Sequence, residues 1–138
     1  MQTFLPYADF HKTARCLDYR RLGKQRVEAK QIIDLLMKEK MGVDITKLPW
    51  GNHPAVKMWK GYLPALIEYY NIIVKEWISR GYNNNMLFIG CPAVIKYPLW
   101  FGRKDFHDAH KSNLLRKNYD YYSKFGWNVS LDLKYIWM

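Results

Sequence analysis

Residues 17–40 read LDYRRLGKQRVEAKQIIDLLMKEK, and this stretch decides the fold class. After Asp18 the residues are mostly good helix formers. The apolar side chains recur at intervals of three and four, the spacing of one helix face, and they are Leu22, Ala29, Ile32, Ile33 and Leu36. Gly42 follows as a C-terminal stop. The sequence therefore predicts a long amphipathic helix from about residue 18 to residue 40.

A second helical region is predicted from about Pro54 to Arg80, with Gly81 as its stop. Pro64 lacks a backbone donor, so we expect it to kink or split this helix near Gly61. The expected buried face again follows helical spacing and consists of Trp59, Leu63, Leu66, Tyr70, Ile73 and Trp77.

A third helix is predicted from about Phe106 to Ser123. Pro92 and Pro98 disfavour both a long helix and a central strand between residues 86 and 104. No segment alternates apolar and polar residues as a half-buried strand would. We therefore predict an all-α fold with three main helices, long irregular connections and no sheet. At 138 residues the whole chain, 1–138, is expected to form one compact domain.

The sequence indicates an intracellular protein. No apolar run approaches the roughly 20 residues of a membrane span, and the N-terminus lacks the pattern of a signal peptide. Cys16 and Cys91 are too few for a disulfide scaffold, so we expect two reduced, buried thiols. We expect a cytoplasmic monomer that contacts no membrane and needs no cofactor or metal.

Positive charge is concentrated in two segments. The chain carries 22 Lys and Arg against 12 Asp and Glu, a net charge of +10. Residues 11–40 hold nine cations and four acids, and residues 96–124 hold seven and three. Such clustering is typical of proteins that bind a polyanion. Because aromatic residues make up 17% of the chain and can stack on bases, we expect that polyanion to be nucleic acid.

Glu28 is the one acid among the five cations of residues 20–30. On a helix it shares a polar face with Lys24, away from the apolar stripe. One interpretation is an exposed ion pair with Lys24, worth about 0.3–0.5 kcal/mol. The other is a carboxylate at the chemical centre of a site for a polyanion. The helix alone leaves both open.

Two further segments carry candidate site residues. In GNHPAVKMWKGY (51–62), His53 precedes the helix-starting Pro54 and either caps that helix or acts in a site. In FHDAHKSNLLRK (106–117), one helix face and its neighbouring positions carry side chains that can donate hydrogen bonds to phosphate groups. They are His107, His110, Asn113, Arg116 and Lys117.

A metal is the alternative for the second of these segments. His107 and His110 are three residues apart, a spacing that can hold a metal ion. No neighbouring residue is fixed as a third ligand, so we expect a phosphate-contacting face instead.

Together these stretches resemble the pyrimidine-dimer DNA glycosylase/AP lyase family, the endonuclease V type known from phages. The similarity is closest to a bacterial and viral branch of it and covers nearly the whole chain. The segments that carry it are LDYRRLGKQRVEAKQI (17–32), NHPAVKMWKGY (52–62), ISRGY (78–82), FHDAHKSNLLRK (106–117) and YYSKFG (121–126).

The resemblance implies a helical enzyme that binds duplex DNA and removes a damaged or modified base. In this chemistry the N-terminal α-amine attacks the sugar C1′, forms an imine and expels the base, and AP-lyase cleavage of the strand follows. A glutamate on the first long helix supports the attack. An α-amine suits the role because its ordinary pKa of about 7.7–8.0 lies well below the value of about 10.4 for lysine.

Two positions depart from the family pattern. The chain begins Met1-Gln2, and a bulky second residue is expected to block removal of the initiator. Either an amine acts as nucleophile, with Met1 as first and Lys24 as second candidate, or the imine chemistry is absent. Arg21 stands where the family's Arg-Glu-Leu-Pro-Arg stretch has its glutamate. Glu28 is the nearest acid on the helix, and we expect it to take that role.

The expected DNA contacts fall into two groups. Phosphate clamps are expected at Arg20, Arg21, Arg26, Arg116 and Lys117. Contacts with the displaced nucleotide or its backbone are expected at His53, His107, His110 and Asn113. Three alternatives remain: a non-catalytic nucleic-acid-binding protein of the same fold, a metal-dependent nuclease using His107 and His110, and an enzyme acting on nucleotides.

Overall fold

The computed structural model describes residues 1–138 and contains helices but no strands. This confirms the predicted all-α class. The elements are α1 (Phe10–Cys16), α2 (Tyr19–Lys40), the 3₁₀ turn η1 (Ile45–Lys47), α3 (Pro54–Lys57), α4 (Leu63–Ser79), α5 (Lys104–Lys117), α6 (Tyr119–Tyr122) and the 3₁₀ turn η2 (Ser123–Phe125). No helix is long and apolar enough to cross a membrane.

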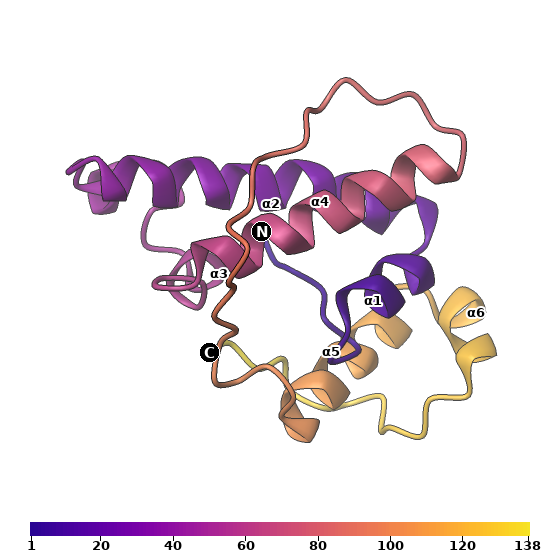
Figure 1. Cartoon of the computed structure of the whole chain (residues 1–138). Coiled ribbons are helices and arrows are strands. Elements are labelled where there is room, and N and C mark those ends of the chain that lie inside the picture. The colour runs from indigo at the N-terminus through magenta and orange to yellow at the C-terminus, as the bar shows by residue number, and fades with distance from the viewer.

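Helices α2 and α4 pack against each other along the centre of the molecule (Figure 1). The predicted apolar stripe of α2 is buried throughout, from Leu22 to Leu36. On α4 the predicted face from Leu63 to Trp77 is buried as well. Because both faces exclude water over several helical turns, their burial is the main source of stability of the pair.

The second predicted helix is split where Pro64 indicated. The first part, α3, starts with Pro54 directly after the His53 cap. The second part, α4, begins at Leu63 and has Pro64 in its first turn, where a missing N–H costs no helix bond. Gly61 between them has φ 82°, a left-handed conformation that favours glycine.

The third predicted helix is two helices. α5 ends at Lys117 because Asn118, with φ −154° and ψ 79°, leaves the helical region. The Asn118 side chain then accepts a hydrogen bond from the Tyr121 N–H and caps α6. The sequence has no glycine or proline at this break, and the helical periodicity therefore predicts one uninterrupted helix here.

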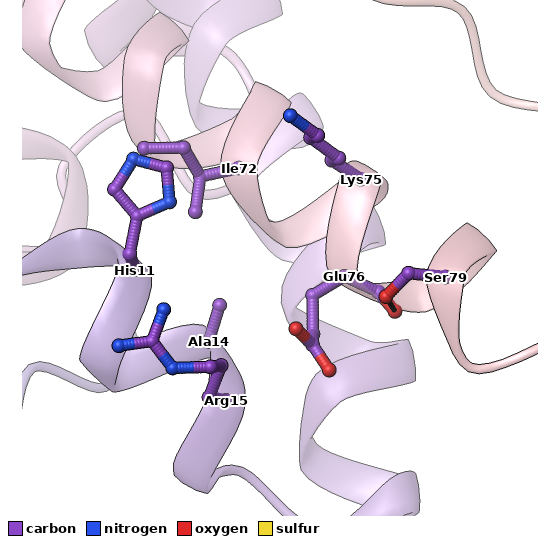
Figure 2. A pocket seen from close by; sticks show the side chains of 7 residues that line it. All are labelled: His11, Ala14, Arg15, Ile72, Lys75, Glu76 and Ser79. Carbon is purple, nitrogen blue, oxygen red and sulfur yellow. Dashed lines mark hydrogen bonds between the residues drawn. The ribbon is translucent and has the colours of Figure 1, made fainter.

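Helix α1 lies against α4, and a small pocket of about 120 Å³ opens between them (Figure 2). His11 and Arg15 line it from α1, and Lys75 and Glu76 line it from α4. The Glu76 carboxylate accepts a hydrogen bond from Arg80 at 2.8 Å. The pocket contains none of the predicted site residues.

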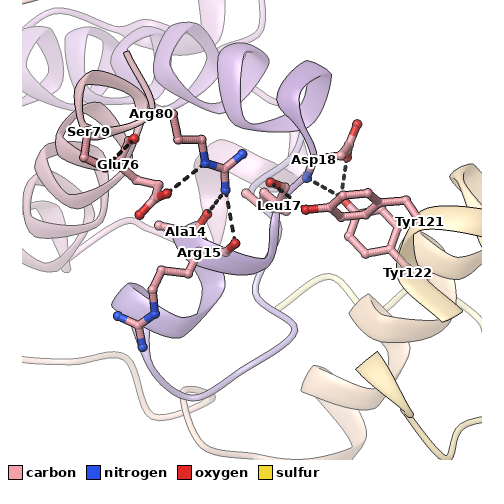
Figure 3. Close-up of polar contacts among 9 residues, drawn as sticks. All are labelled: Ala14, Arg15, Leu17, Asp18, Glu76, Ser79, Arg80, Tyr121 and Tyr122. Atoms are coloured by element: carbon pink, nitrogen blue, oxygen red, sulfur yellow. Dashed lines mark hydrogen bonds and ion pairs between the residues drawn. The ribbon is translucent and has the colours of Figure 1, made fainter. Parts of the chain in front are cut away.

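Arg80 also fixes the end of α1 (Figure 3). Its Nη2 donates to the carbonyl oxygens of Ala14 and Arg15, both at 3.1 Å. These carbonyls belong to the last turn of α1, which has no helical partners for them. Arg80 therefore joins the corner between α1 and α2 to the end of α4.

The same corner is tied to α6. The Asp18 N–H donates to the Tyr122 hydroxyl at 3.0 Å, and that hydroxyl donates to the Asp18 carboxylate (Figure 3). The Tyr121 hydroxyl lies 3.5 Å from the Leu17 carbonyl oxygen. These bonds hold the start of α2 in a fixed position relative to the C-terminal third of the chain.

The N-terminal segment, residues 1–6, is extended and runs through the middle of the helices before α1 (Figure 1). Thr3, Phe4 and Leu5 are almost completely buried, and Phe4 and Leu5 belong to the hydrophobic core. Cys16 is buried as expected, whereas Cys91 is exposed, since it lies on the irregular connection after α4. A buried N-terminal segment is the feature that positions the site.

Candidate active site at the N-terminus

Gln25 on α2 is buried, and its side-chain amide forms hydrogen bonds with the backbone of the N-terminal segment. Its Oε1 accepts a hydrogen bond from the Phe4 N–H at 3.0 Å, and its Nε2 donates to the Gln2 carbonyl at 2.9 Å. The Tyr69 hydroxyl from α4 lies 2.5 Å from Gln25 Oε1 and 2.9 Å from the Phe4 carbonyl oxygen. Buried backbone groups of the segment are thereby satisfied.

His107 and His110 of α5 hold both backbone groups of Leu5. The Leu5 N–H donates to His110 Nδ1 at 3.0 Å, and His107 Nδ1 donates to the Leu5 carbonyl at 2.7 Å. The Gly102 N–H donates to His107 Nε2 at 2.9 Å. These partners require the neutral form of both rings, with the proton on Nδ1 in His107 and on Nε2 in His110.

Burial is the main cause that lowers the pKa of both histidines. The pKa of His107 is lowered from its ordinary value, and that of His110 is lowered to about 3. Neither ring is a cation at neutral pH, so neither offers a phosphate a positive charge. The predicted role of these two residues in binding DNA remains a prediction, and the structure gives them a positioning role.

Thr3 receives two more bonds from distant segments. The Trp59 indole N–H donates to Thr3 Oγ1 at 3.1 Å, and the Tyr135 hydroxyl lies 3.4 Å from the Thr3 carbonyl oxygen. Residues 2–5 are thus bonded to α2, α4, α5, the turn after α3 and the C-terminal segment. A segment held by this many partners has little freedom, and it fixes where the preceding residue, Met1, lies.

Glu28 lies one turn after Gln25 on α2 and points at the start of the chain. Its Oε2 accepts from Gln25 Nε2 at 3.1 Å and lies 3.4 Å from the Gln2 backbone nitrogen. The ion pair with Lys24 that the sequence allowed does not form, and Lys24 is exposed. Since covalent geometry places the Met1 amine within about 4 Å of the Gln2 nitrogen, Glu28 and the amine are neighbours.

His53 caps α3 and faces the same place. Its Nδ1 accepts from the Ala55 N–H at 3.0 Å, so the neutral ring carries its proton on Nε2. Burial lowers its pKa first and the charge of the N-terminal amine lowers it further, while the Glu28 carboxylate acts in the opposite direction. The amine, Glu28 and His53 therefore lie within electrostatic range of one another.

Two predicted residues of α5 border the segment. Asn113 Oδ1 lies 3.5 Å from Gln2 Nε2, and Lys117 Nζ lies 6.0 Å from the centre of the Phe4 ring. Lys117 is exposed at the end of α5. The structure thus brings Glu28 and Asn113 to Gln2 and places His53 within electrostatic range of the Met1 amine, whereas Lys117 lies beside Phe4.

Two arginines of α2, Arg21 and Arg26, form contacts with residues other than those of the N-terminal segment. Arg21 forms an ion pair with Asp18 at 3.2 Å. The Arg26 guanidinium covers the Trp77 ring at 4.1 Å and donates to Asn84 at 2.8 Å, and burial lowers its pKa. Both side chains therefore have intramolecular partners that a phosphate contact would have to replace.

Arg116 and Arg20 complete the predicted phosphate clamps. Arg116 Nη1 donates to Ser112 Oγ and to the Leu131 carbonyl, both at 2.7 Å, and so holds the C-terminal segment on α5. Arg20 is exposed. Their contacts with DNA remain predictions.

The chain contains no group of three or more His, Cys, Asp or Glu side chains placed to hold a metal ion. In the His107–His110 pair, three of the four ring nitrogens bind backbone groups, and only His110 Nε2 lacks a partner. These two rings therefore do not present a pair of free nitrogens to one ion.

Sequence reasoning missed the residues that hold the segment: Gln25, Tyr69, Tyr135 and Thr3. A signal was present for Gln25, because it lies between Leu22 and Ala29 at the spacing of the buried stripe. A polar residue at a buried position needs a hydrogen-bond partner. No local pattern names that partner, which lies 21 residues away.

A family model described as pyrimidine dimer DNA glycosylase matches residues 1–90. The matched part includes Met1, Gln25, Glu28 and His53, and it ends before α5. No curated protein and no solved structure matches the chain.

Proposed function

Since the chain belongs to the pyrimidine dimer DNA glycosylase family, we propose that it removes a damaged or modified base from duplex DNA with the α-amine of Met1 as nucleophile. The observation that carries this proposal is the buried N-terminal segment, which ends beside Glu28. An enzyme that uses its terminal amine needs that terminus held still, because positioning the reacting groups lowers the barrier.

The first step exchanges one bond at C1′ for another. The amine lone pair forms the N–C1′ bond while the glycosidic bond breaks and its electron pair leaves with the base. The nitrogen then loses one proton, and its lone pair forms the C1′=N bond as the C1′–O4′ bond breaks. O4′ takes up a proton, which leaves a protonated imine between the protein and the DNA. Glu28 accepts a proton from the amine and stabilises the positive charge that develops on the sugar.

The second step is the AP-lyase reaction. The imine acidifies the sugar C2′–H, a base removes that proton, and the 3′ phosphate leaves by β-elimination. We assign this proton transfer to Glu28 as well, and its support is the 3.4 Å distance between the carboxylate and the backbone nitrogen of Gln2, the residue after Met1. Hydrolysis of the imine releases the amine for another cycle.

Positive charge near the site supports DNA binding. Lys24 lies one turn before Glu28 on α2, and Lys117 on α5 lies 6.0 Å from the centre of the Phe4 ring; both side chains are exposed. With a net charge of +10, the protein attracts the phosphate backbone without regard to base sequence. Selection of the damaged base then falls to groups at the site itself.

Borohydride trapping tests the proposal. Wild-type protein is mixed with a duplex that carries an abasic site or a pyrimidine dimer, and borohydride reduces any imine to a stable adduct. Glu28→Gln is expected to lose base removal and strand cleavage while still binding the duplex. Asp34→Asn, which removes an exposed acid from the same helix, is the matched control and is expected to behave like wild type.

Failure would take a distinct form. If wild type binds duplex DNA with steep salt dependence, forms no adduct and leaves both substrates intact, the chain is a nucleic-acid-binding protein of the same fold. Activity that a chelator abolishes would instead indicate the metal-dependent alternative.

A further inference from the structure

Cationic side chains line both walls of the pocket between α1 and α4 (Figure 2). His11 and Arg15 lie one turn apart on α1, and Lys75 faces them from α4. All three side chains are exposed. The protein has seven ion pairs, and none of them includes Arg15 or Lys75. Both of these cations are therefore available to an anion from solvent.

Glu76 is the one acid that lines the pocket, and its charge is already paired. Its Oε2 accepts a hydrogen bond from Arg80 Nε at 2.8 Å, and the two side chains are only 20% and 21% exposed. Arg15 lines the same pocket but does not pair with this carboxylate. Because Arg80 compensates Glu76, the positive charges of Arg15 and Lys75 are not cancelled.

Arg80 also compensates the second source of negative charge beside the pocket. The last carbonyl oxygens of a helix carry partial negative charge. At the end of α1 the carbonyl oxygens of Ala14 and Arg15 accept hydrogen bonds from Arg80 Nη2, both at 3.1 Å (Figure 3). One guanidinium thus binds both the carboxylate and the carbonyl groups that would otherwise repel an anion.

The size and donors of the pocket indicate the class of ligand. Its volume of about 120 Å³ is well below the roughly 300–1,000 Å³ of pockets that hold drug-sized molecules. A small ion or a single charged group fits this space better than a whole nucleoside. An Arg guanidinium binds phosphate oxygens with two parallel hydrogen bonds, and a Lys ammonium adds a point charge.

We propose that this pocket binds one phosphate group, held by Arg15 and Lys75, with the His11 ring as a further hydrogen-bond partner. The proposal goes beyond base removal, because the pocket contains none of the residues around Met1. The phosphate group belongs either to a free phosphate-bearing molecule or to the DNA backbone away from the N-terminal site.

Titration with inorganic phosphate tests the pocket directly. Phosphate replaces chloride at constant ionic strength, and the amide signals of isotope-labelled protein are followed by NMR. We expect saturable shifts at His11, Arg15 and Lys75. Arg15→Gln and Lys75→Gln should each weaken the affinity about twofold to fivefold, as expected for one exposed charge. The double variant should show no saturable shift.

Two further variants separate a specific site from general attraction. Lys47→Gln removes an exposed lysine that also has no ion pair, and it should bind phosphate as wild type does. Glu76→Gln keeps an acceptor for Arg80 but removes the negative charge, so its affinity for phosphate should rise about twofold to fivefold. Equal or weaker binding by Glu76→Gln would contradict the charge balance assigned to Arg80.

Binding of an undamaged duplex distinguishes the two sources of the phosphate group. If the pocket holds a backbone phosphate, the Arg15→Gln/Lys75→Gln double variant should reduce the salt dependence of log K by up to about two contacts. If the ligand is a free molecule, duplex binding should stay unchanged while phosphate binding is lost. Shifts spread evenly over the protein surface, or a double variant that still saturates with phosphate, would overturn the proposal. Neither measurement requires catalysis, so a wild-type protein that forms no borohydride adduct would leave this test intact.

Discussion

The backbone nitrogen of Gln2 and the carboxylate of Glu28 lie 3.4 Å apart, so the first peptide of the chain rests against the one acid of a basic helix face. This contact answers the question that the cationic run of residues 20–30 raises. Glu28 is neither a surface ion-pair partner nor isolated. Its carboxylate lies against the N-terminal segment, whose amine is the proposed nucleophile.

Gln25 should be the side chain on which the position of the amine depends most. Gln25→Leu leaves the Phe4 N–H and the Gln2 carbonyl without their buried partners, and we expect a loss of about 2–4 kcal/mol in the free energy of unfolding. Urea denaturation measures this loss. Gln31→Leu, an exposed glutamine on the same helix, should change stability by less than about 0.5 kcal/mol, and equal effects of the two variants would contradict the assignment.

The lowered pKa of His110 predicts how the stability of the protein changes with pH. Its pKa is about 3 in the folded protein, below the value of about 6.5 expected in the unfolded chain. The unfolded state therefore binds a proton that the folded state does not, and stability falls as the pH decreases from about 6.5 towards 3. His107, whose pKa is lowered as well, adds to the same trend.

His110→Gln tests the origin of this pH dependence. Glutamine can accept the bond from the Leu5 N–H and does not titrate, so the variant should lose stability less steeply below pH 6.5 than wild type. His11→Gln, which replaces an exposed histidine, should keep the wild-type slope. Urea midpoints between pH 7 and pH 4 give the slopes, and an unchanged slope in His110→Gln would refute the explanation.

Lys117 should contact a phosphate. Because each neutralised phosphate releases counterions, Lys117→Gln should weaken binding to any duplex and reduce the salt dependence of log K by about one phosphate contact. Lys38→Gln, an exposed lysine in the last turn of α2, is the matched control and should leave the salt dependence unchanged. Equal slopes for wild type and Lys117→Gln would remove this residue from the interface.

Trp50 should destabilise the fold through its backbone, because its φ is 68°. Trp50→Gly and Trp50→Ala lose the same side-chain contacts, but glycine adopts positive φ without steric cost. The glycine variant should therefore be more stable than the alanine variant by about 1 kcal/mol, measured as the difference in urea midpoints multiplied by the m-value. An alanine variant as stable as the glycine variant would show that the loop is not strained at this position.

Local sequence patterns predicted much of the fold. The α2 stripe and the break at Pro64 follow from spacing and from proline chemistry, and both were correct. The break at Asn118 was missed, since asparagine marks a helix end only weakly. The end of a helix depends on the conformation and capping bonds of one or two residues, and the periodicity of the apolar side chains does not reveal them.

The candidate site was less predictable because its bonds join distant residues. The sequence indicates Glu28 because it is the one acid among the cations of residues 20–30, and His53 because it precedes Pro54 at the start of a helix. Their distance from the N-terminus depends on the path of residues 1–6 through the core, which the sequence does not show. The spacing of His107 and His110 suggested a phosphate or metal face. Their partner, Leu5, is more than 100 residues away, and no pattern within α5 reveals it.

The most direct test of the central claim is to locate the borohydride adduct within the protein. Wild-type protein is trapped on an abasic-site duplex, the DNA is digested, and mass spectrometry of the peptides identifies the modified nitrogen. The account predicts that the sugar remnant is on the α-amine of Met1, with Lys24→Arg trapping as well as wild type. An adduct on Lys24, or on any other lysine, with an unmodified N-terminal peptide would contradict it.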